Sequence, residues 1–267
     1  MKEFANSYAR NSKGWILFPS GKNNSYRAAM FPPEASTHPA KANIHLVQAI
    51  IEFVSKPDDT LLDIMAGVGT IMVGALIGRK VICVEISEIF YKMQLEAVKM
   101  LENMAPGVAD SIMCINMPCQ VYLPIPNLAN HIIFSPQYSG ILLRKGKPSQ
   151  WNIDTKYNLA EYNKNPLNLG VMSDFVWAEE MGRVYKKCYE SLTTPGSMTL
   201  IIKDRIEHGI RIDLTGKTID ASIEAGFSYS PTEHFRWAAP GMPFTSARKA
   251  RGETVVEDES IIVLRKE

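Results

Sequence analysis

Hydrophobic and polar positions alternate in blocks along most of the chain, and the blocks predict helices and strands in turn. Apolar residues recur at helical spacing over residues 44–54, and the polar stretch SKPDD separates this predicted helix from TLLDI, a short apolar run typical of a buried strand. After the glycine-containing sequence AGVGT come another helix, the strand KVICVE and a long amphipathic helix over about 87–104. Strands are also predicted at SIMCI, HIIF and SMTLII, with helices across roughly 173–191 and 214–225.

This alternation predicts an α/β fold with one main sheet. Parallel strands need crossover connections, and the helices between the strands supply them, so we expect a mainly parallel sheet with helices on both faces. The last two strand-like runs, GFSYSPTEHFRW and SIIVLRK, are joined by a loop without helical periodicity and predict an antiparallel final hairpin, giving seven strands. Residues 1–41 are rich in Asn, Ser and Pro and predict an irregular N-terminal arm before a single domain over 42–267.

The composition narrows the class of protein. With 267 residues, of which 46% are hydrophobic, the chain can form one well-packed core. Its 29 basic and 28 acidic residues leave a net charge of +1, so a nucleic acid would have to be met by a local patch. The sequence shows no apolar leader and no run near the roughly 18 apolar residues of a membrane span, so we expect a cytoplasmic protein. Its four cysteines form no CxxC pair and no histidine lies in a cluster of ligand spacing, so no metal is expected.

The sequence DIMAGVGT marks a candidate ligand site. Asp63 ends a predicted buried strand, and Gly67 and Gly69 lie in the turn that opens the next helix, where glycines let a ligand approach the backbone. Glu85 ends the next strand 22 residues later, where its carboxylate could accept hydrogen bonds from the two hydroxyls of a ribose. Alternatively, the glycines only form a tight turn and Glu85 only caps the following helix. Binding of NAD is less favoured, because GVGT lacks the GxGxxG spacing of dinucleotide sites.

Four short sequences together resemble one enzyme family, and they are HPAK at 38–41, DIMAGVGT at 63–70, VEI at 84–86 and SPQY at 135–138. Over roughly residues 36–265 the chain resembles the amino-group DNA methyltransferases, which use S-adenosylmethionine to modify cytosine N4 or adenine N6. The family's Rossmann-like fold, a seven-stranded α/β sheet with an antiparallel final hairpin, agrees with the layout predicted above. In the glycine loop, Ile64 and Met65 replace the Pro and Phe that are typical of the family.

The resemblance implies which residues bind S-adenosylmethionine. The glycine loop would hold the methionine portion, Glu85 would bind the ribose hydroxyls, and the HPAK segment would close over the methionine end. Asn116 is the nearest candidate beside the adenine ring, where the family often has an acidic residue. The expected cofactor-binding residues are His38, Lys41, Asp63, Ala66, Gly67, Gly69, Thr70, Glu85 and Asn116.

SPQY resembles the family's catalytic motif, which has Asp, Asn or Ser, then Pro-Pro, then an aromatic residue. An exocyclic amino group is a weak nucleophile because its lone pair is delocalised, and two hydrogen-bond acceptors around its hydrogens favour the nitrogen geometry that attacks a methyl group. The resemblance implies that Ser135 Oγ and the Pro136 carbonyl are those acceptors. It also implies that Tyr138 stacks on a base rotated out of the double helix.

Gln137 departs from the family motif, because it replaces the second proline. A proline there would restrict ψ of Pro136 and so help to fix the direction of its carbonyl. The glutamine amide could contact the base and select it, the change could be tolerated, or the site could be inactive. The alternative for the whole segment is an ordinary strand exit in which Tyr138 only packs.

Two basic segments flank this motif and are candidate nucleic-acid contacts, although each alone is more often a solvated surface. Residues 236–251 contain four basic residues, no acidic one, and the aromatic side chains of Trp237 and Phe244, a combination that suits phosphates and bases. The long connection over 139–172 begins at the motif, carries five basic and two acidic residues, and is a candidate target-recognition loop. The expected nucleic-acid contacts are Arg144, Lys145, Lys147, Arg236, Arg248, Lys249 and Arg251.

The resemblance therefore predicts methyl transfer from S-adenosylmethionine to an exocyclic amino nitrogen of DNA, with cytosine N4 slightly ahead of adenine N6 because family habit associates Ser135 with that base. One alternative is an RNA methyltransferase that acts on guanine N2 of transfer RNA. Another is a catalytically inactive nucleic-acid-binding module that retains the fold, and methylation of a small molecule is less favoured. Because no separate recognition domain is visible, a homodimer or a partner subunit could supply target recognition.

Overall fold

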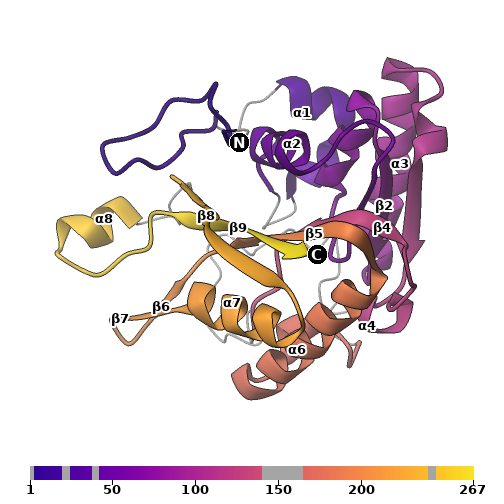
Figure 1. Ribbon diagram of the computed structural model, residues 1–267. Helices are drawn as coiled ribbons and strands as arrows, with labels where there is room; N and C mark the ends of the chain where they lie inside the picture. The colour runs from indigo at the N-terminus through magenta and orange to yellow at the C-terminus, as the bar shows by residue number, and fades with distance from the viewer. Residues whose placement is uncertain (1–2, 20–24, 38–41, 140–164, 240–244) are drawn as a thin grey trace.

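The computed structural model describes residues 3–19, 25–37, 42–139, 165–239 and 245–267, and these ranges form one layered α/β unit (Figure 1). Their main sheet has seven strands in the order β3-β2-β1-β4-β5-β9-β8. The pairs among the first five strands of this order are parallel, whereas β9 pairs antiparallel with both β5 and β8. The strands of the sheet are β1 (Thr60–Asp63), β2 (Lys80–Glu85), β3 (Ile112–Asn116), β4 (Ala129–Phe134), β5 (Leu192–Ile202), β8 (Ser228–Trp237) and β9 (Glu259–Lys266).

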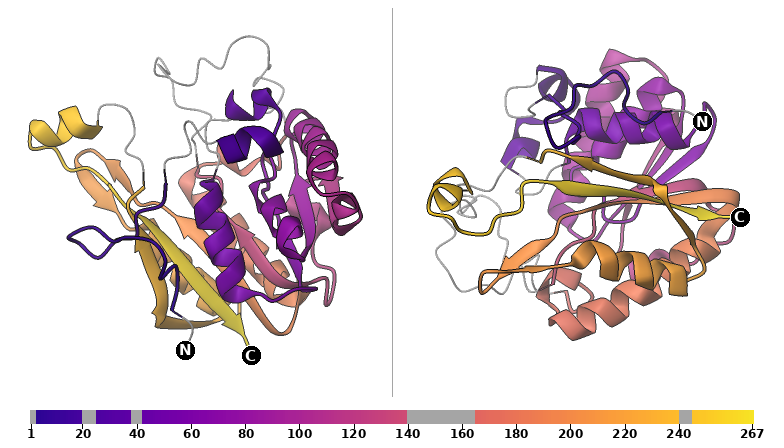
Figure 2. Two further views of the ribbon diagram at one scale, coloured as in Figure 1. Left: turned by 90° about the horizontal axis from the view of Figure 1, so that it is seen from above. Right: turned by 60° about the vertical axis from the view of Figure 1, so that its left-hand side comes forward.

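Helices cover both faces of the sheet (Figures 1 and 2). One face carries α1 (Ser25–Met30), α2 (Ile44–Val54), the 3₁₀ segment η3 (Thr70–Ile77) and α3 (Glu88–Met104). The other face carries α4 (Cys119–Tyr122), α6 (Asp174–Ser191) and α7 (Leu214–Glu224). The remaining short helical segments are η2 (Pro33–Thr37), η4 (Val108–Ser111), η5 (Leu169–Val171) and α8 (Thr245–Ala250).

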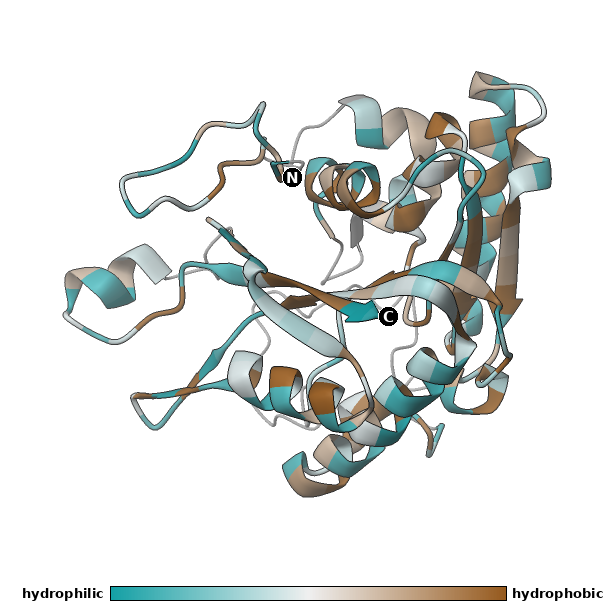
Figure 3. Cartoon of the chain, in the orientation of Figure 1, coloured by the Kyte–Doolittle hydropathy of each residue, from teal (hydrophilic) through white to brown (hydrophobic). Residues whose placement is uncertain are grey.

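Two hydrophobic cores lie between these layers, one on each face of the sheet. In Figure 3 the long helices α3 and α6 carry both hydrophobic and hydrophilic colours, as expected when one side of a helix is buried. Side chains also define where helices begin. Asn43 Oδ1 accepts hydrogen bonds from the backbone nitrogens of His45 and Leu46 at the start of α2, and Ser173 caps α6. The fold class predicted from periodicity is therefore confirmed.

Two local elements differ from the sequence-based prediction. The segment after the glycine turn is the 3₁₀ segment η3, where a helix of ordinary type was expected. The structure also contains an unpredicted hairpin, β6 (Arg205–Glu207) and β7 (Ile210–Ile212), beyond the end of β5. Its two-residue turn, His208-Gly209, has positive φ at both positions, as a tight hairpin turn with the twist of its strands requires. Three-residue strands are too short to give a clear alternating pattern in the sequence.

The N-terminal arm belongs to the same packed unit as the rest of the chain. Phe4, Ile16 and Phe31 are almost fully buried in the core beside α2 and α3. Ile16 also pairs with Trp237 at the end of β8, with the Ile16 nitrogen donating to the Arg236 carbonyl at 3.0 Å. The described part of the arm contains α1 and η2, and its buried side chains fill part of the same core.

None of the helices in the described ranges is long and apolar enough to cross a membrane.

Candidate active site

The candidate site lies at the edge of the sheet where the parallel strands end. β1 ends at Asp63, β2 at Glu85 and β3 at Asn116, and β4 leads directly into Ser135. The chain steps from β1 outward to β2 and β3, and then returns to place β4 on the other side of β1. Ligands of open α/β sheets bind beyond the carboxyl ends of the strands at such a reversal. The topology therefore gathers the two predicted motifs, which are about 70 residues apart in sequence, at one edge.

Glu85 stabilises the glycine loop through its side-chain carboxylate. Its carboxylate accepts hydrogen bonds from the backbone nitrogens of Gly67, at 2.7 Å, and Ser87, at 2.8 Å. Asn116 on the neighbouring strand donates its side-chain amide to the Glu85 carbonyl at 2.8 Å. Glu85 is only 4% exposed, and burial raises the pKa of its carboxyl to about 7 against the lowering effect of the backbone donors. A buried carboxylate with acceptor capacity left over suits a ligand that brings hydroxyl donors.

Asp63 is the second carboxyl at this edge, and it is half-buried. Its Oδ1 accepts a hydrogen bond from the backbone nitrogen of Met65 at 2.9 Å, which shapes the first turn of the loop. Burial, followed by repulsion from the charge of Glu85, raises the pKa of Asp63 to about 7. The two carboxyls therefore share one electrostatic environment, in which a cationic or hydroxyl-bearing ligand would favour their ionised forms.

Gln94 is a part of this loop support that the sequence did not single out. It lies on α3, is fully buried, and donates its side-chain amide to the Gly67 carbonyl at 2.7 Å. Its Oε1 is buried and has no hydrogen-bond partner in the described structure. A polar residue on the inward face of an amphipathic helix was the available signal, because such positions are usually apolar.

Gly69 gives the glycine loop a left-handed backbone conformation. Its φ is +82°, a conformation that favours glycine, and a Cβ there would come within 2.7 Å of the Met72 side chain. A side chain at this position would therefore contact Met72, and cofactor binding by Gly69 stays a prediction. Ala66 is buried beside the loop and bonds through its nitrogen to the Val84 carbonyl at 3.0 Å.

Ser135 and Pro136 lie where β4 leaves the sheet. Ser135 is exposed, and its hydroxyl donates to the Ile201 carbonyl of β5 at 3.0 Å. Because the hydroxyl hydrogen is used in that bond, the lone pairs of Oγ remain available as acceptors. No hydrogen bond among the described residues uses the Pro136 carbonyl. Neither acceptor is thus used up within the described residues, with Ser135 exposed and Pro136 buried, and their action on an amino group stays a prediction.

The next two residues are anchored to neighbouring elements. The Gln137 carbonyl accepts a hydrogen bond from Trp177 Nε1 of α6 at 2.6 Å. The Tyr138 hydroxyl accepts one from the backbone nitrogen of Lys203 at 2.7 Å, and burial raises the pKa of this phenol. Tyr138 packs against the core on the α6 face. Its stacking on a base stays a prediction, and the anchor defines where the ring lies.

Ser139 adds a third anchor to the motif. Its hydroxyl bonds to Asp174 at the start of α6, and Arg205 Nη1 donates to the same hydroxyl at 2.9 Å. Arg205 also forms an ion pair with Asp174, so the three side chains close a small network. The backbone after Pro136 is therefore held at three successive residues by contacts with α6 and the end of β5.

Most of the basic stretch at 236–251 is paired with acidic residues that follow it. Arg248 and Arg251 both donate to Glu253, at 2.8 and 2.7 Å, and Lys249 donates to Glu257 at 2.7 Å. These are exposed pairs, which stabilise the fold little but lower the local positive charge.

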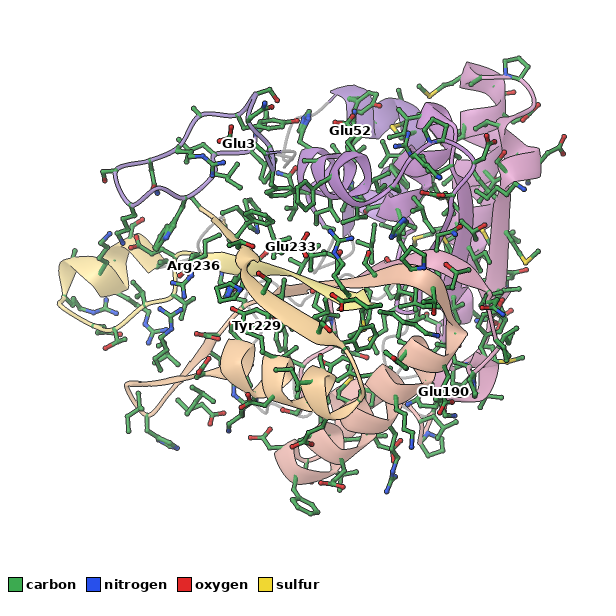
Figure 4. The ribbon with its side chains drawn as sticks, viewed as in Figure 1. Glu3, Glu52, Glu190, Tyr229, Glu233 and Arg236 are labelled. Atoms are coloured by element: carbon green, nitrogen blue, oxygen red, sulfur yellow. The ribbon has the colours of Figure 1, made fainter. Side chains whose placement is uncertain are left out.

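Arg236 completes the same pattern. Figure 4 labels it on β8, at the end from which the chain leads to α8, and its guanidinium lies 3.3 Å from the buried Asp258 carboxylate. Three acidic residues that follow the stretch, Glu253, Glu257 and Asp258, thus form ion pairs with its four basic residues. The stretch itself carries four positive charges and no negative one, and the acids that follow it lower the net charge around it. Contact of these residues with nucleic acid stays a prediction.

Five predicted site residues lie outside the described ranges. They are His38 and Lys41 of the HPAK segment, and Arg144, Lys145 and Lys147 of the candidate target-recognition loop. Their predicted roles therefore stay predictions.

The residues at the carboxyl edge fit S-adenosylmethionine by their chemistry. Glu85 offers a buried acceptor at the end of β2 for the ribose diol, and Asp63 offers a second, half-buried carboxylate beside the loop. Asn116 stands next to Glu85 at the end of β3, where it could meet the adenine. Gln94 Oε1 adds an acceptor without a partner. The ribose diol and the amine of S-adenosylmethionine are hydrogen-bond donors, and its sulfonium is positively charged. The protein side chains named above offer acceptor oxygens to these groups.

The described fold is that of the S-adenosylmethionine-dependent methyltransferases. Similar solved structures include the [4+2]-cyclase SpnF, with a TM-score of 0.55 at 12% identity over 84% of this chain and 81% of that one. An O-methyltransferase from Thermotoga maritima has a TM-score of 0.52 at 12% identity, covering 97% and 77%. TrmN from Thermus thermophilus has a TM-score of 0.51 at 15% identity, covering 90% of this chain and 53% of TrmN, so the chain spans about half of that protein. These likenesses establish the fold alone, and SpnF is named as a cyclase.

The sequence itself narrows the class further. Residues 4–96 match the N6_N4_Mtase family model, described as DNA methylase. The match covers about a third of the chain, includes the glycine loop and Glu85, and agrees with the resemblance seen in the motifs. No match was found among curated proteins. Methyl transfer dependent on S-adenosylmethionine is thereby supported as the general activity.

Proposed function

We propose that the protein transfers a methyl group from S-adenosylmethionine to an exocyclic amino nitrogen of a DNA base, with cytosine N4 ahead of adenine N6. The observation that carries this proposal is the state of the two acceptors after β4. Ser135 is exposed with its hydrogen bonded to Ile201, and the Pro136 carbonyl is unused by the described residues. Two adjacent acceptors match the two hydrogens of an amino group, whereas a hydroxyl or a ring nitrogen offers one hydrogen or none.

The chemistry divides simply between cofactor and protein. S-adenosylmethionine supplies an electrophilic methyl group on a sulfonium centre. Ser135 Oγ and the Pro136 carbonyl accept the amino hydrogens and draw the nitrogen toward tetrahedral geometry, so that its lone pair points at the methyl carbon. The nitrogen–carbon bond forms as the carbon–sulfur bond breaks, and the extra proton leaves the nitrogen for solvent afterwards. No side chain has to act as a strong base.

Gln137 is compatible with this mechanism because neighbouring residues replace the restraint of a second proline. The Trp177 indole fixes the Gln137 carbonyl, and the bonds to Tyr138 and Ser139 fix the next two residues. The direction of the preceding Pro136 carbonyl depends on the same short piece of backbone. Trp177 is therefore a positioning residue in this proposal.

Trp177→Phe is expected to lower kcat about fivefold with unchanged cofactor affinity, since it removes one hydrogen bond worth about 1 kcal/mol from the loop. Gln137→Pro is expected to keep activity, because no described hydrogen bond uses the Gln137 nitrogen. In the Gln137→Pro background the Trp177→Phe change should cost less, as proline restores the restraint. Steady-state kinetics of the four proteins measure this coupling, and equal losses from Trp177→Phe in both backgrounds would show that Trp177 only supports the fold.

The direct test of the proposed function is transfer of tritium from labelled S-adenosylmethionine to unmethylated genomic DNA and, separately, to bulk RNA. Nucleosides from each digest are then identified by mass spectrometry. DNA that the protein has already methylated with unlabelled cofactor is the control, because its acceptor sites are filled. N4-methylcytosine or N6-methyladenine in DNA is the expected result and names the base. Label only in RNA would transfer the proposal to an RNA methyltransferase. Label in neither polymer, with the cofactor bound, would favour the inactive binding module.

A further inference from the structure

Arg27 is a buried arginine beside the glycine loop that the sequence did not single out. It lies on α1 within the N-terminal arm and is 8% exposed. Its Nη2 donates to Thr70 Oγ1, the last residue of DIMAGVGT, at 3.1 Å, and its Nη1 donates to the Ala42 carbonyl at 3.0 Å. The guanidinium also lies over the Phe31 ring at 5.0 Å. These contacts place a full positive charge against the loop expected to hold the methionine portion of the cofactor.

The charge of Arg27 is not matched within the described structure. Its Nε is buried without a hydrogen-bond partner, and no carboxylate among the described residues forms an ion pair with it. Burial lowers the pKa of Arg27 to about 10, with no compensating effect from an acidic neighbour. A buried charge without a counterion destabilises a fold, so such a group usually has a ligand or partner that offsets the cost.

Arg79 shows what a purely structural buried arginine looks like in this protein. It has the same 8% exposure. All three of its guanidinium nitrogens donate within the protein, Nε to Ser55 Oγ at 3.1 Å, Nη2 to the Ser55 carbonyl at 2.9 Å and Nη1 to the Ile77 carbonyl at 2.5 Å. Arg27 lacks this complete set, and it borders the candidate site where Arg79 does not.

We propose that Arg27 binds the carboxylate of the methionine portion of S-adenosylmethionine. A planar guanidinium with free N–H groups matches a carboxylate in a two-point contact. Asp63 and Glu85, at the ends of β1 and β2, are acids and would repel that carboxylate, so the ligand's amine and diol are expected on their side and its acid end on the Arg27 side. The assignment rests on the cofactor named under the proposed function, and it gives the N-terminal arm a direct part in the site.

The test compares two ligands that differ only in the carboxylate, S-adenosylhomocysteine and its decarboxylated form, S-adenosyl-3-thiopropylamine. Calorimetry on the full chain measures both affinities for wild type, Arg27→Gln, Arg27→Lys and the control Arg79→Gln. Loss of the carboxylate should weaken binding to wild type about 10- to 100-fold, as expected for charge-assisted hydrogen bonds. Arg27→Gln should bind both ligands within about twofold of each other, Arg27→Lys should keep part of the difference, and Arg79→Gln should keep all of it.

The outcomes separate this proposal from the proposed function. If Arg27→Gln weakens both ligands equally, or if wild type binds them equally well, Arg27 is structural and the inference is wrong while the cofactor site stands. If wild type binds neither ligand, the cofactor assignment fails and takes this inference with it. The wild-type comparison needs no variant to fold, and thermal unfolding of each variant identifies losses that come from instability alone.

Discussion

Replacing Ser135 by alanine is expected to lower kcat for methyl transfer about 100-fold, because one of two preorganised hydrogen-bonding groups at the reacting nitrogen is lost. Cofactor affinity should stay within about twofold, since Ser135 follows β4 whereas the carboxyls assigned to the cofactor end β1 and β2. The fold should lose about 1 kcal/mol or less, because the change removes a single bond to the Ile201 carbonyl at an exposed position. The expected result is therefore a folded protein that binds cofactor and turns over slowly.

Single-turnover methylation of DNA and calorimetry with S-adenosylhomocysteine separate these effects. Ser228→Ala is the matched control, because Ser228 is also exposed. In the sheet Ser228 lies opposite Arg265 of β9, and Arg265 lies opposite Ser197 near the start of β5. It therefore lies at the opposite edge of the sheet, and the control should keep full activity. Wild-type rates in the Ser135→Ala protein would remove Ser135 as an acceptor and leave its hydroxyl a purely structural role.

The elements that could be predicted from sequence are those whose signal repeats along the chain. The parallel strands are short apolar runs, and α3 and α6 are long enough for several helical periods, so local pattern and final structure agree. The edge on which Asp63 and Glu85 meet also follows from pattern, because each residue ends a strand and parallel strands end together. The position of Ser135 at this edge could be predicted for the same reason, because it directly follows β4.

The rest depends on contacts between residues far apart in the chain. Arg27 and Gln94 contact the glycine loop only because α1 and α3 pack beside it. Trp177 contacts the SPQY motif only because α6 packs beside it. The ion pairs that Arg248, Lys249 and Arg251 form with Glu253 and Glu257 could not be read from the composition of 236–251 alone, because their partners follow it in sequence. The arm looked separate because its few buried side chains have no regular spacing, yet they complete the core on the α2 face.

Affinity for the cofactor is expected to rise about tenfold as the pH increases from 6 to 8. The pKa of Glu85 in the ligand-free fold is about 7, so at pH 6 most of this carboxyl is protonated and must lose its proton before it can accept from both ribose hydroxyls. Asp63, with a pKa also about 7, changes in the same direction. Calorimetry in buffers of different ionisation enthalpy should also detect proton release on binding below pH 7.

The stability of the ligand-free protein should change with the opposite sign. Between about 4.5, the ordinary pKa of a glutamate, and about 7, the folded state keeps a proton that the unfolded state has released. This carboxyl therefore lowers the free energy of unfolding as pH rises through that window, by roughly 3 kcal/mol in full. The cofactor reverses that loss at neutral pH, because it binds the ionised form. Thermal unfolding across pH 5 to 8, with and without S-adenosylhomocysteine, measures both trends.

Glu85→Gln connects the two trends to one residue. It should weaken cofactor binding about 100-fold at pH 8, because two charge-assisted hydrogen bonds are lost, and it should flatten the pH dependence of affinity. Part of the flattening comes through Asp63, whose pKa falls when the neighbouring charge is removed. Glu259→Gln is the control, since Glu259 is a half-buried carboxyl whose pKa is also raised by burial but which bonds to Trp237 instead. A Glu85→Gln protein with wild-type affinity at pH 8 would contradict the assignment of the ribose to the end of β2, and with it the cofactor orientation on which the Arg27 contact depends.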